Sequence, residues 1–139
     1  MPNAANEPWV ERYRDDCIAL IGVESVVDHR FGVAVSGGPD SMALLWLAGR
    51  AFPGRVHAAT VDHRLREEAR AEAEMVALWC AGQGLPHSIL TPTKPIIGNI
   101  QSAARATRYA LLEDWRAQNG IDWLLTAHHA DDQLETLLM

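Results

Sequence analysis

A glycine pair between an apolar run and an amphipathic segment is the first feature of the sequence that could do chemistry. Residues 33–45 read VAVSGGPDSMALL, in which the glycines follow a β-branched run and precede a helical pattern. Glycine lets a backbone approach a ligand closely, and the amino end of a helix directs N–H groups and a positive dipole to the same point. An ordinary turn fits too, but we predict a phosphate or pyrophosphate site formed by Ser36, Gly37, Gly38, Pro39, Asp40 and Ser41.

The common nucleotide-binding fingerprints are absent from this segment. The Walker A pattern G-x-x-x-x-G-K-[ST] does not occur, and Lys94 is the only lysine of the chain. The dinucleotide pattern G-x-G-x-x-G does not occur either. Support for a phosphate site therefore depends on which other residues the fold brings to the same place.

A second polar segment, Val61-Asp62-His63-Arg64, follows another apolar run. The backbone beside Val61 could hydrogen-bond a base, and Asp62 or His63 could contact a ribose or a metal ion. Asp62 could equally cap a helix and leave His63 in solvent. Both interpretations stay open at this point.

The highest density of titratable groups lies near the end of the chain. Residues 126–135 read TAHHADDQLE, which holds two imidazoles and three carboxylates. We predict that a helix begins here, on which Asp131 and Glu135 share a face, as do Asp132 and Glu135. Such a pair could hold Mg²⁺ with waters or orient an amine. Acidic residues also favour a helix amino end for electrostatic reasons alone.

Two arginines, Arg105 and Arg108, are spaced to share one face of another predicted helix. Guanidinium groups near phosphate oxygens would stabilise negative charge. Arginines on a helix also serve solubility alone, so this assignment depends on the fold.

These groups meet only if the elements between them form a parallel sheet. Apolar runs alternate with helical patterns, with strands predicted at 31–35, 56–61, 87–90 and 122–127 and helices at 39–50, 65–83, 99–119 and from 131 onward. This alternation predicts an α/β domain with a doubly wound parallel sheet in three layers. The carboxyl ends of the strands would then lie at one edge, where ligands of such sheets bind.

Residues 8–22 precede the sheet and have helical spacing. We predict a helix here, with a packing face formed by Trp9, Tyr13, Cys17, Leu20 and Ile21. The chain accordingly divides into an N-terminal helix region, residues 1–30, and a catalytic domain, residues 31–139. Since no stop signal follows the helical pattern at 131–139, we expect a fragment of a longer protein.

The bulk composition limits the class of protein. With 139 residues, of which 48% are hydrophobic, the chain suits one domain with a packed core. Its net charge of −6 argues against binding nucleic acid over the whole surface. Two distant cysteines, Cys17 and Cys80, indicate neither a disulfide framework nor a thiolate metal site. With no membrane-length apolar run and no signal peptide, we expect a cytoplasmic protein.

Four segments together resemble a known family. SGGPDS at 36–41 matches the SGGxDS signature of N-type PP-loop ATP pyrophosphatases, which cleave ATP between its α and β phosphates to adenylate a substrate. VDHRLR at 61–66, NIQSAARATRY at 99–109 and TAHHADDQLET at 126–136 are similar to segments of the lysidine synthetase group of this family. The matches run in order over most of the chain.

The resemblance implies an adenine-nucleotide alpha-hydrolase-like fold and a ligase that uses ATP and Mg²⁺. Its substrates would be free L-lysine and the wobble cytidine of an isoleucine tRNA with a CAU anticodon. By resemblance, the nucleotide would be bound by Ser36, Gly37, Gly38, Pro39, Asp40, Ser41, Val61, Asp62, His63 and Arg105. Catalytic roles would fall to Asp40, Arg108, His128, Asp132 and Glu135, and Mg²⁺ contacts to Asp40 and Asp131.

The family's C-terminal tRNA-binding domains are absent from this chain, so we expect ATP binding from it and little modification activity. No membrane partner is expected, and a homodimer is left open. Another PP-loop enzyme that thiolates or amidates its acceptor is an alternative, although thiolation of the two-thiocytidine class would need paired cysteines. A non-catalytic nucleotide-binding module, or a metal phosphohydrolase using His63, His128 and Asp131, is also compatible with the sequence.

Overall fold

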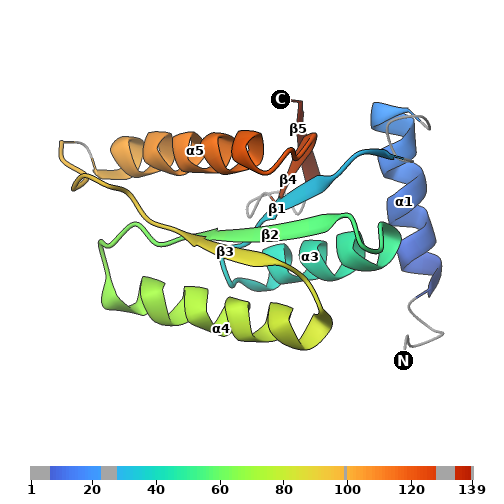
Figure 1. The fold of residues 1–139 in the computed structure, drawn as a ribbon, viewed down its shortest axis with the longest axis horizontal. Coiled ribbons are helices and arrows are strands. Elements are labelled where there is room, and N and C mark those ends of the chain that lie inside the picture. The colour runs from blue at the N-terminus through green and yellow to red at the C-terminus, as the bar shows by residue number, and fades with distance from the viewer. Residues whose placement is uncertain (1–6, 23–27, 99, 128–133, 139) are drawn as a thin grey trace.

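The structure is a computed structural model that describes residues 7–22, 28–98, 100–127 and 134–138. Strands and helices alternate along the chain (Figure 1). The elements are α1 (Glu7–Ile21), β1 (Phe31–Ala34), α3 (Pro39–Ala51), β2 (Val56–Val61), α4 (Glu67–Gln83), β3 (His87–Leu90), α5 (Ile100–Gln118), β4 (Trp123–Ala127) and β5 (Leu134–Leu138).

The strands form one five-stranded sheet in the order β3-β2-β1-β4-β5. The first four are parallel, with β1 paired to β2 on one side and to β4 on the other. Helices α3 and α4 cover one face and α5 covers the opposite face (Figure 1). The predicted doubly wound α/β fold is therefore confirmed, and the reversal of strand order beside β1 makes its carboxyl end a favoured ligand position.

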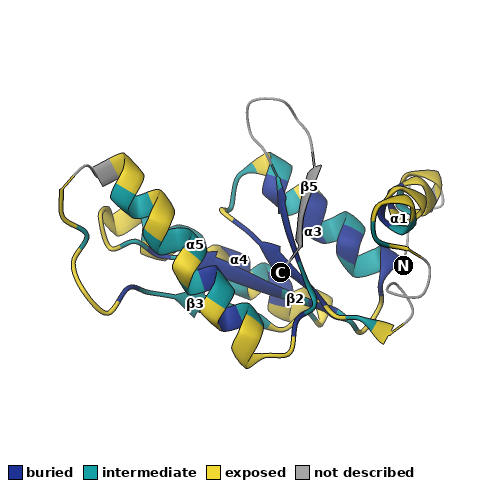
Figure 2. Ribbon diagram, turned by 90° about the horizontal axis from the view of Figure 1, so that it is seen from above, coloured by how far each residue is buried: buried dark blue, intermediate teal, exposed yellow. Residues whose placement is uncertain are grey.

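The core lies on both faces of the central strands; β1 is buried at every residue, and β2 and β4 are buried at most of theirs (Figure 2). On the α3 side, the rings of Phe31 and Phe52 stack with centroids 4.2 Å apart, and Tyr13 meets Phe52 edge-on at 6.4 Å. On the α5 side, Trp115 lies so close to Gly32 that a Cβ there would sit 2.8 Å from the indole ring. Strand β1 is thus fixed to a helix on each face.

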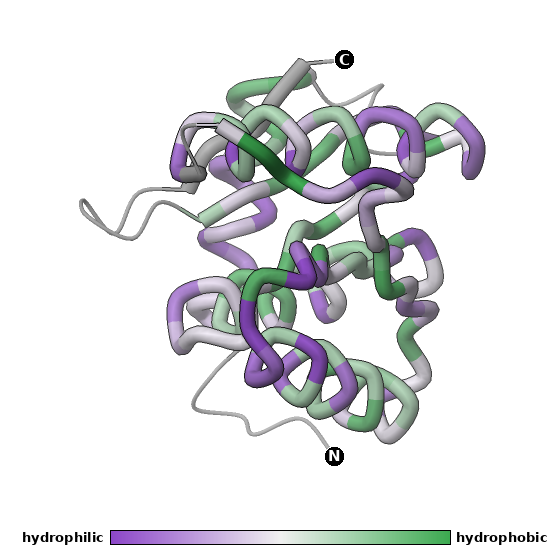
Figure 3. The backbone as a smooth tube through the Cα atoms, turned by 90° about the vertical axis from the view of Figure 1, so that its left-hand side faces the viewer, coloured by the Kyte–Doolittle hydropathy of each residue, from purple (hydrophilic) through white to green (hydrophobic). Residues whose placement is uncertain are grey.

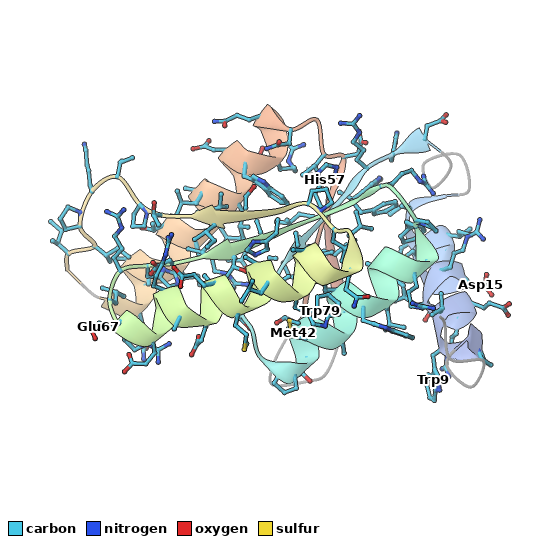
Figure 4. All side chains as sticks on the ribbon, turned by 60° about the horizontal axis from the view of Figure 1, so that its bottom comes forward. Trp9, Asp15, Met42, His57, Glu67 and Trp79 are labelled. Atoms are coloured by element: carbon cyan, nitrogen blue, oxygen red, sulfur yellow. The ribbon has the colours of Figure 1, made fainter. Side chains whose placement is uncertain are left out.

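The packing face of α1 differs from the prediction. Tyr13 and Cys17 are buried as expected, but Trp9 is 62% and Leu20 is 70% exposed. Ile21 packs against the core as predicted, and Val10 and Ile18 do so in place of Trp9 and Leu20. The buried stripe is centred on Cys17 and Val10, so Trp9 and Leu20 lie at its flank. Figure 4 shows Trp9 directed away from the sheet.

The predicted helix after β4 is wrong for the described part of that segment. Leu134–Leu138 forms β5, which pairs antiparallel with β4 in a register that sets Glu135 opposite Thr126. Without this partner, β4 would present an open row of backbone donors and acceptors at the sheet edge. Pairing of that edge outweighs the helix propensity of the leucines. The helical spacing expected of Asp131 and Glu135 does not apply to a strand.

Among the described helices, none is long and apolar enough to cross a membrane.

Candidate nucleotide-binding site

The loop between β1 and α3 is closed by its own hydrogen bonds. The hydroxyl of Ser41 accepts from the backbone N–H of Ser36 at 3.1 Å and lies 3.1 Å from the Ser36 hydroxyl. It also donates to the carbonyl of Gly38 at 3.2 Å, and the N–H of Gly38 donates to the Ser36 hydroxyl at 3.3 Å. The two serines of SGGPDS therefore hold the turn in one shape.

The two glycines of the loop have different conformations. Gly37 has φ of +91°, a left-handed conformation that favours glycine, whereas Gly38 is extended with φ of −74° and ψ of 164°. Gly37 also faces α4, since a Cβ there would lie 3.7 Å from Glu72 and Val76. Only Gly37 is therefore required by the backbone of this turn.

The first turn of α3 points its N–H groups toward this loop. Pro39 occupies the first turn, Asp40 adds an acidic side chain, and among the described residues no side chain caps the helix. An uncapped amino end next to a tight turn is a suitable site for an anion. The loop and the amino end of α3 are thus arranged as a phosphate site would need, and the site itself stays a prediction.

A pocket of about 140 Å³ opens where β1 and β2 end. Strands β2 and β3 run toward the left of Figure 1, and Figure 3 views the molecule from that side. The residues lining the pocket come from four elements and include Ser36, Thr60, Val61, His63, Arg66, Glu72 and Arg108. The fold therefore brings together the loop after β1, the segment after β2 and the arginine helix, as the sequence predicted.

His63 lies in this pocket, whereas Asp62 is directed elsewhere. Asp62 is buried, with 4% of the residue exposed, and its carboxylate accepts a hydrogen bond from the Arg64 N–H at 2.9 Å, so it stabilises the turn after β2. The Nδ1 atom of His63 is buried and has no hydrogen-bond partner among the described residues. Because the atom itself is buried, a ligand could bind it only if the imidazole turned toward the pocket.

Burial, then the positive charge of Arg108, lowers the pKa of His63; Asp62 opposes this effect and Arg66 adds to it. A lowered pKa keeps the imidazole neutral near pH 7. A neutral ring with an unpaired nitrogen can exchange a hydrogen bond with a sugar or base but adds no charge to the pocket.

The two candidate arginines are distinguished by their surroundings. Arg108 lines the pocket beside Ser36, and it also lines a neighbouring hollow of about 430 Å³ that shares His63. Arg105 lines only that neighbouring hollow, with its guanidinium 5.4 Å from the ring centre of Tyr109. Arg108 is therefore the better placed of the two to face phosphate groups held at the loop.

Among the charged residues that line the pocket, Arg66 and Glu72 were missed by the sequence analysis. Together with Ala69 they recur every three residues, and the small side chain of Ala69 leaves room between them. This spacing at the start of a helix that follows VDHR is the signal that could have identified them.

The predicted residues of the TAHHADDQLET segment are only partly described. His128, Asp131 and Asp132 lie outside the described residues, and Glu135 is described only as a position in β5. In the parts of the chain that the structure covers, no three His, Cys, Asp or Glu side chains are grouped to hold a metal ion. Mg²⁺ is commonly bound by one or two carboxylates together with phosphate oxygens, which Asp40 at the loop fits.

The fold and the pocket define an α/β nucleotide-binding domain with its site at the carboxyl edge of the sheet. A sequence profile of the PP-loop domain matches residues 14–139. The chain therefore belongs to the PP-loop domain family.

Similar proteins agree with this assignment. The curated tRNA(Ile)-lysidine synthase of Ruegeria pomeroyi is 48% identical over 137 residues, covering 88% of this chain and 33% of that protein. The enzyme of the same name from Methylobacterium nodulans is 55% identical over 109 residues, covering 77% of this chain and 32% of that protein. The chain thus spans about a third of the length of the curated relatives it matches.

Solved structures of other proteins share the fold. The U34-tRNA thiolase NcsA from Methanococcus maripaludis superposes with a TM-score of 0.70 at 15% identity, over 91% of this chain and 48% of that chain. The NH3-dependent NAD synthetase from Campylobacter jejuni superposes with a TM-score of 0.60 at 18% identity, over 85% of this chain and 55% of that chain. At these identities the likeness concerns the fold alone.

Proposed function

We propose that this chain is the ATP-binding catalytic domain of a tRNA(Ile)-lysidine synthase. The observation that carries the proposal is the pocket at the ends of β1 and β2, which is lined by both Ser36 of the PP-loop and Arg108 of α5. The similarity to curated proteins named tRNA(Ile)-lysidine synthase supports the proposal. The resemblance of the sequence motifs to that family implies the substrates, which are ATP, free L-lysine and the wobble cytidine of an isoleucine tRNA with a CAU anticodon.

In the first step, the C2 oxygen of the cytidine attacks the α-phosphorus of ATP, and pyrophosphate leaves. The loop from Ser36 to Ser41 and the amino end of α3 hold the departing phosphates with backbone N–H groups. Arg108 offsets their charge, and the backbone at Val61 borders the adenine. Asp40 would bind Mg²⁺, which neutralises phosphate charge when it is present.

In the second step, the side-chain amine of lysine attacks C2 of the adenylated cytidine, and AMP leaves with the C2 oxygen. The amine must lose a proton to become nucleophilic. By resemblance we assign this proton transfer and the positioning of lysine to His128, Asp132 and Glu135. Asp131 would assist at the metal, while Arg105 and His63 would contact the nucleotide from the neighbouring hollow.

The proposal is tested with the protein that carries this chain, ATP, labelled lysine and isoleucine tRNA transcripts with CAU or UAU anticodons. We expect label in the CAU transcript alone, together with release of pyrophosphate and AMP. If pyrophosphate exchange with ATP occurs but no label reaches the tRNA, the enzyme adenylates another acceptor and the lysidine assignment is wrong.

A second measurement addresses the nucleotide pocket. We expect Arg108→Ala to weaken ATP binding roughly tenfold, since a charge-assisted contact to phosphate is lost. Arg50→Ala is the control, because Arg50 stacks over Trp46 near the other end of α3. Equal ATP affinity of the two variants would contradict the position we assign to the phosphates.

The thiolation alternative receives no support from the cysteines. Cys17 and Cys80 are both free and buried in the same apolar cluster, and burial raises the pKa of each thiol. A buried thiol with a raised pKa is a poor nucleophile.

A further inference from the structure

A second hollow lies between the connection from β2 to α4 and the connection from β3 to α5. Its volume is about 420 Å³, which is within the range of sites that bind small ligands. His63 forms part of its wall and also lines the nucleotide pocket, so the two spaces adjoin at one imidazole. The remaining walls combine two cations with an apolar surface.

The cations are Arg64 and Lys94, both exposed. Among the described residues, no carboxylate forms an ion pair with either of them, whereas Arg70 and Arg116 are paired with glutamates. The acidic residues of the neighbouring turn, Glu67 and Glu68, do not line the hollow; Figure 4 shows Glu67 at the outer start of α4. Two uncompensated cations on a chain with net charge −6 favour a polyanion at this place.

The backbone of Arg64 is strained in a way that supports a ligand role. With φ of +62°, Arg64 has the only left-handed non-glycine backbone among the described residues. The buried carboxylate of Asp62 holds this conformation through the Arg64 N–H at 2.9 Å. Such a conformation costs about 1–2 kcal/mol and persists where its surroundings enforce it. Here it places Arg64 in the wall of the hollow.

The apolar part of the hollow includes Leu65, Pro95 and Ile96, together with the buried Pro92. Leu65 is 43% exposed, so its apolar side chain is accessible to a ligand in the hollow. An unpaired base can lie against apolar side chains while its phosphate is bound by cations nearby. The hollow therefore matches one nucleotide of a single strand better than a free inorganic anion, which would leave the apolar wall in water.

We infer that this hollow binds the nucleotide of single-stranded RNA that neighbours the reacting one. Its phosphate lies between Arg64 and Lys94, and its base lies against Leu65, Pro95 and Ile96. The inference rests on the proposed function, since that function supplies an RNA substrate whose reacting base must reach the ATP bound in the adjoining pocket. His63, which lines both spaces, lies between the ATP pocket and the bound RNA nucleotide.

The test measures RNA and ATP binding separately, using the protein that carries this chain. The RNA probe is a fluorescent anticodon stem-loop with a CAU anticodon, titrated at several salt concentrations. Arg64→Asn removes the cation and tolerates the left-handed backbone, and Lys94→Ala removes the second cation. Arg12→Gln on the exposed face of α1 changes the net charge equally and serves as the control.

We expect each hollow variant to weaken RNA binding roughly tenfold and to lower the salt slope by about one, with ATP affinity unchanged. Unchanged RNA affinity, an equal effect of Arg12→Gln, or absence of RNA binding by the unaltered protein would overturn the inference. A parallel loss of ATP affinity would assign the hollow to the nucleotide site instead. Failure of lysine transfer by the unaltered protein contradicts the proposed function alone, because the RNA titration does not depend on the acceptor chemistry.

Discussion

The hydroxyl of Ser41 lies 3.1 Å from the backbone nitrogen of Ser36, so a buried side chain of α3 binds the loop that follows β1. Ser41→Ala removes this bond and leaves the Ser36 N–H without that acceptor. We expect a loss of about 1–3 kcal/mol in the free energy of unfolding, together with weaker ATP binding. Urea unfolding and an ATP titration measure the two effects. A variant with unaltered ATP affinity would show that this bond does not shape the phosphate cradle.

The two glycines of the loop are expected to respond differently to alanine. Gly37→Ala forces a Cβ onto a left-handed backbone, which costs about 1–2 kcal/mol although the nearest side-chain atoms are 3.7 Å away. Gly38→Ala is the matched control, since its backbone is extended and its Cβ would meet only the Ser36 hydroxyl at 3.4 Å. In thermal or urea unfolding, Gly38→Ala should be more stable than Gly37→Ala. The reverse order would contradict the turn conformation.

Contact between Gly32 and Trp115 predicts a packing effect on the opposite face of β1. Gly32→Ala would place a methyl group 2.8 Å from the indole ring, and the strain should reduce the free energy of unfolding by about 1–3 kcal/mol. Gly82→Ala in α4 is the control, because nothing lies within 4 Å of its Cβ. Helix propensity predicts that this control is neutral or stabilised by up to about 1 kcal/mol. Equal unfolding midpoints would contradict the close approach.

Stability is expected to fall as the solution is acidified from neutral pH. Burial lowers the pKa of His57, His63 and His87 in the folded state, so the unfolded chain takes up protons first. Stabilisation from these residues is therefore present above the unfolded pKa of about 6.5 and is lost as the pH falls below it. Urea midpoints across this range should change less in His87→Gln than in the unaltered protein. An identical pH profile would show that His87 does not contribute.

Much of the fold could be predicted because glycine and proline mark where its elements end. Strand β2 and strand β3 begin and end where their apolar runs do, and α3 begins at Pro39 as expected. The β5 segment could not be predicted in this way. Leucine and glutamate suit a helix, and only the open edge of β4, which no local pattern reveals, makes the strand more favourable.

The candidate site was predictable where its residues are adjacent in the sequence and not where tertiary packing brings them together. The SGGPDS loop is local, so its residues identify it without knowledge of the fold. The choice between Arg105 and Arg108 depends on how α5 lies across the sheet. The presence of Arg66 and Glu72 in the pocket depends on how α4 packs beside the loop after β1. The burial of Asp62, which turns its carboxylate to the backbone of Arg64, likewise follows from tertiary packing alone.

The stacked rings of Phe31 and Phe52 connect the first residue of β1 to the residue that ends α3. Strand and helix are thereby joined far from the loop, and Ser41 joins them again next to it. A loop whose two stems cannot separate has little conformational entropy left to lose when phosphate binds. The cradle is therefore preorganised, and nucleotide affinity should reflect the contacts made with the ligand, with little free energy spent on ordering the protein.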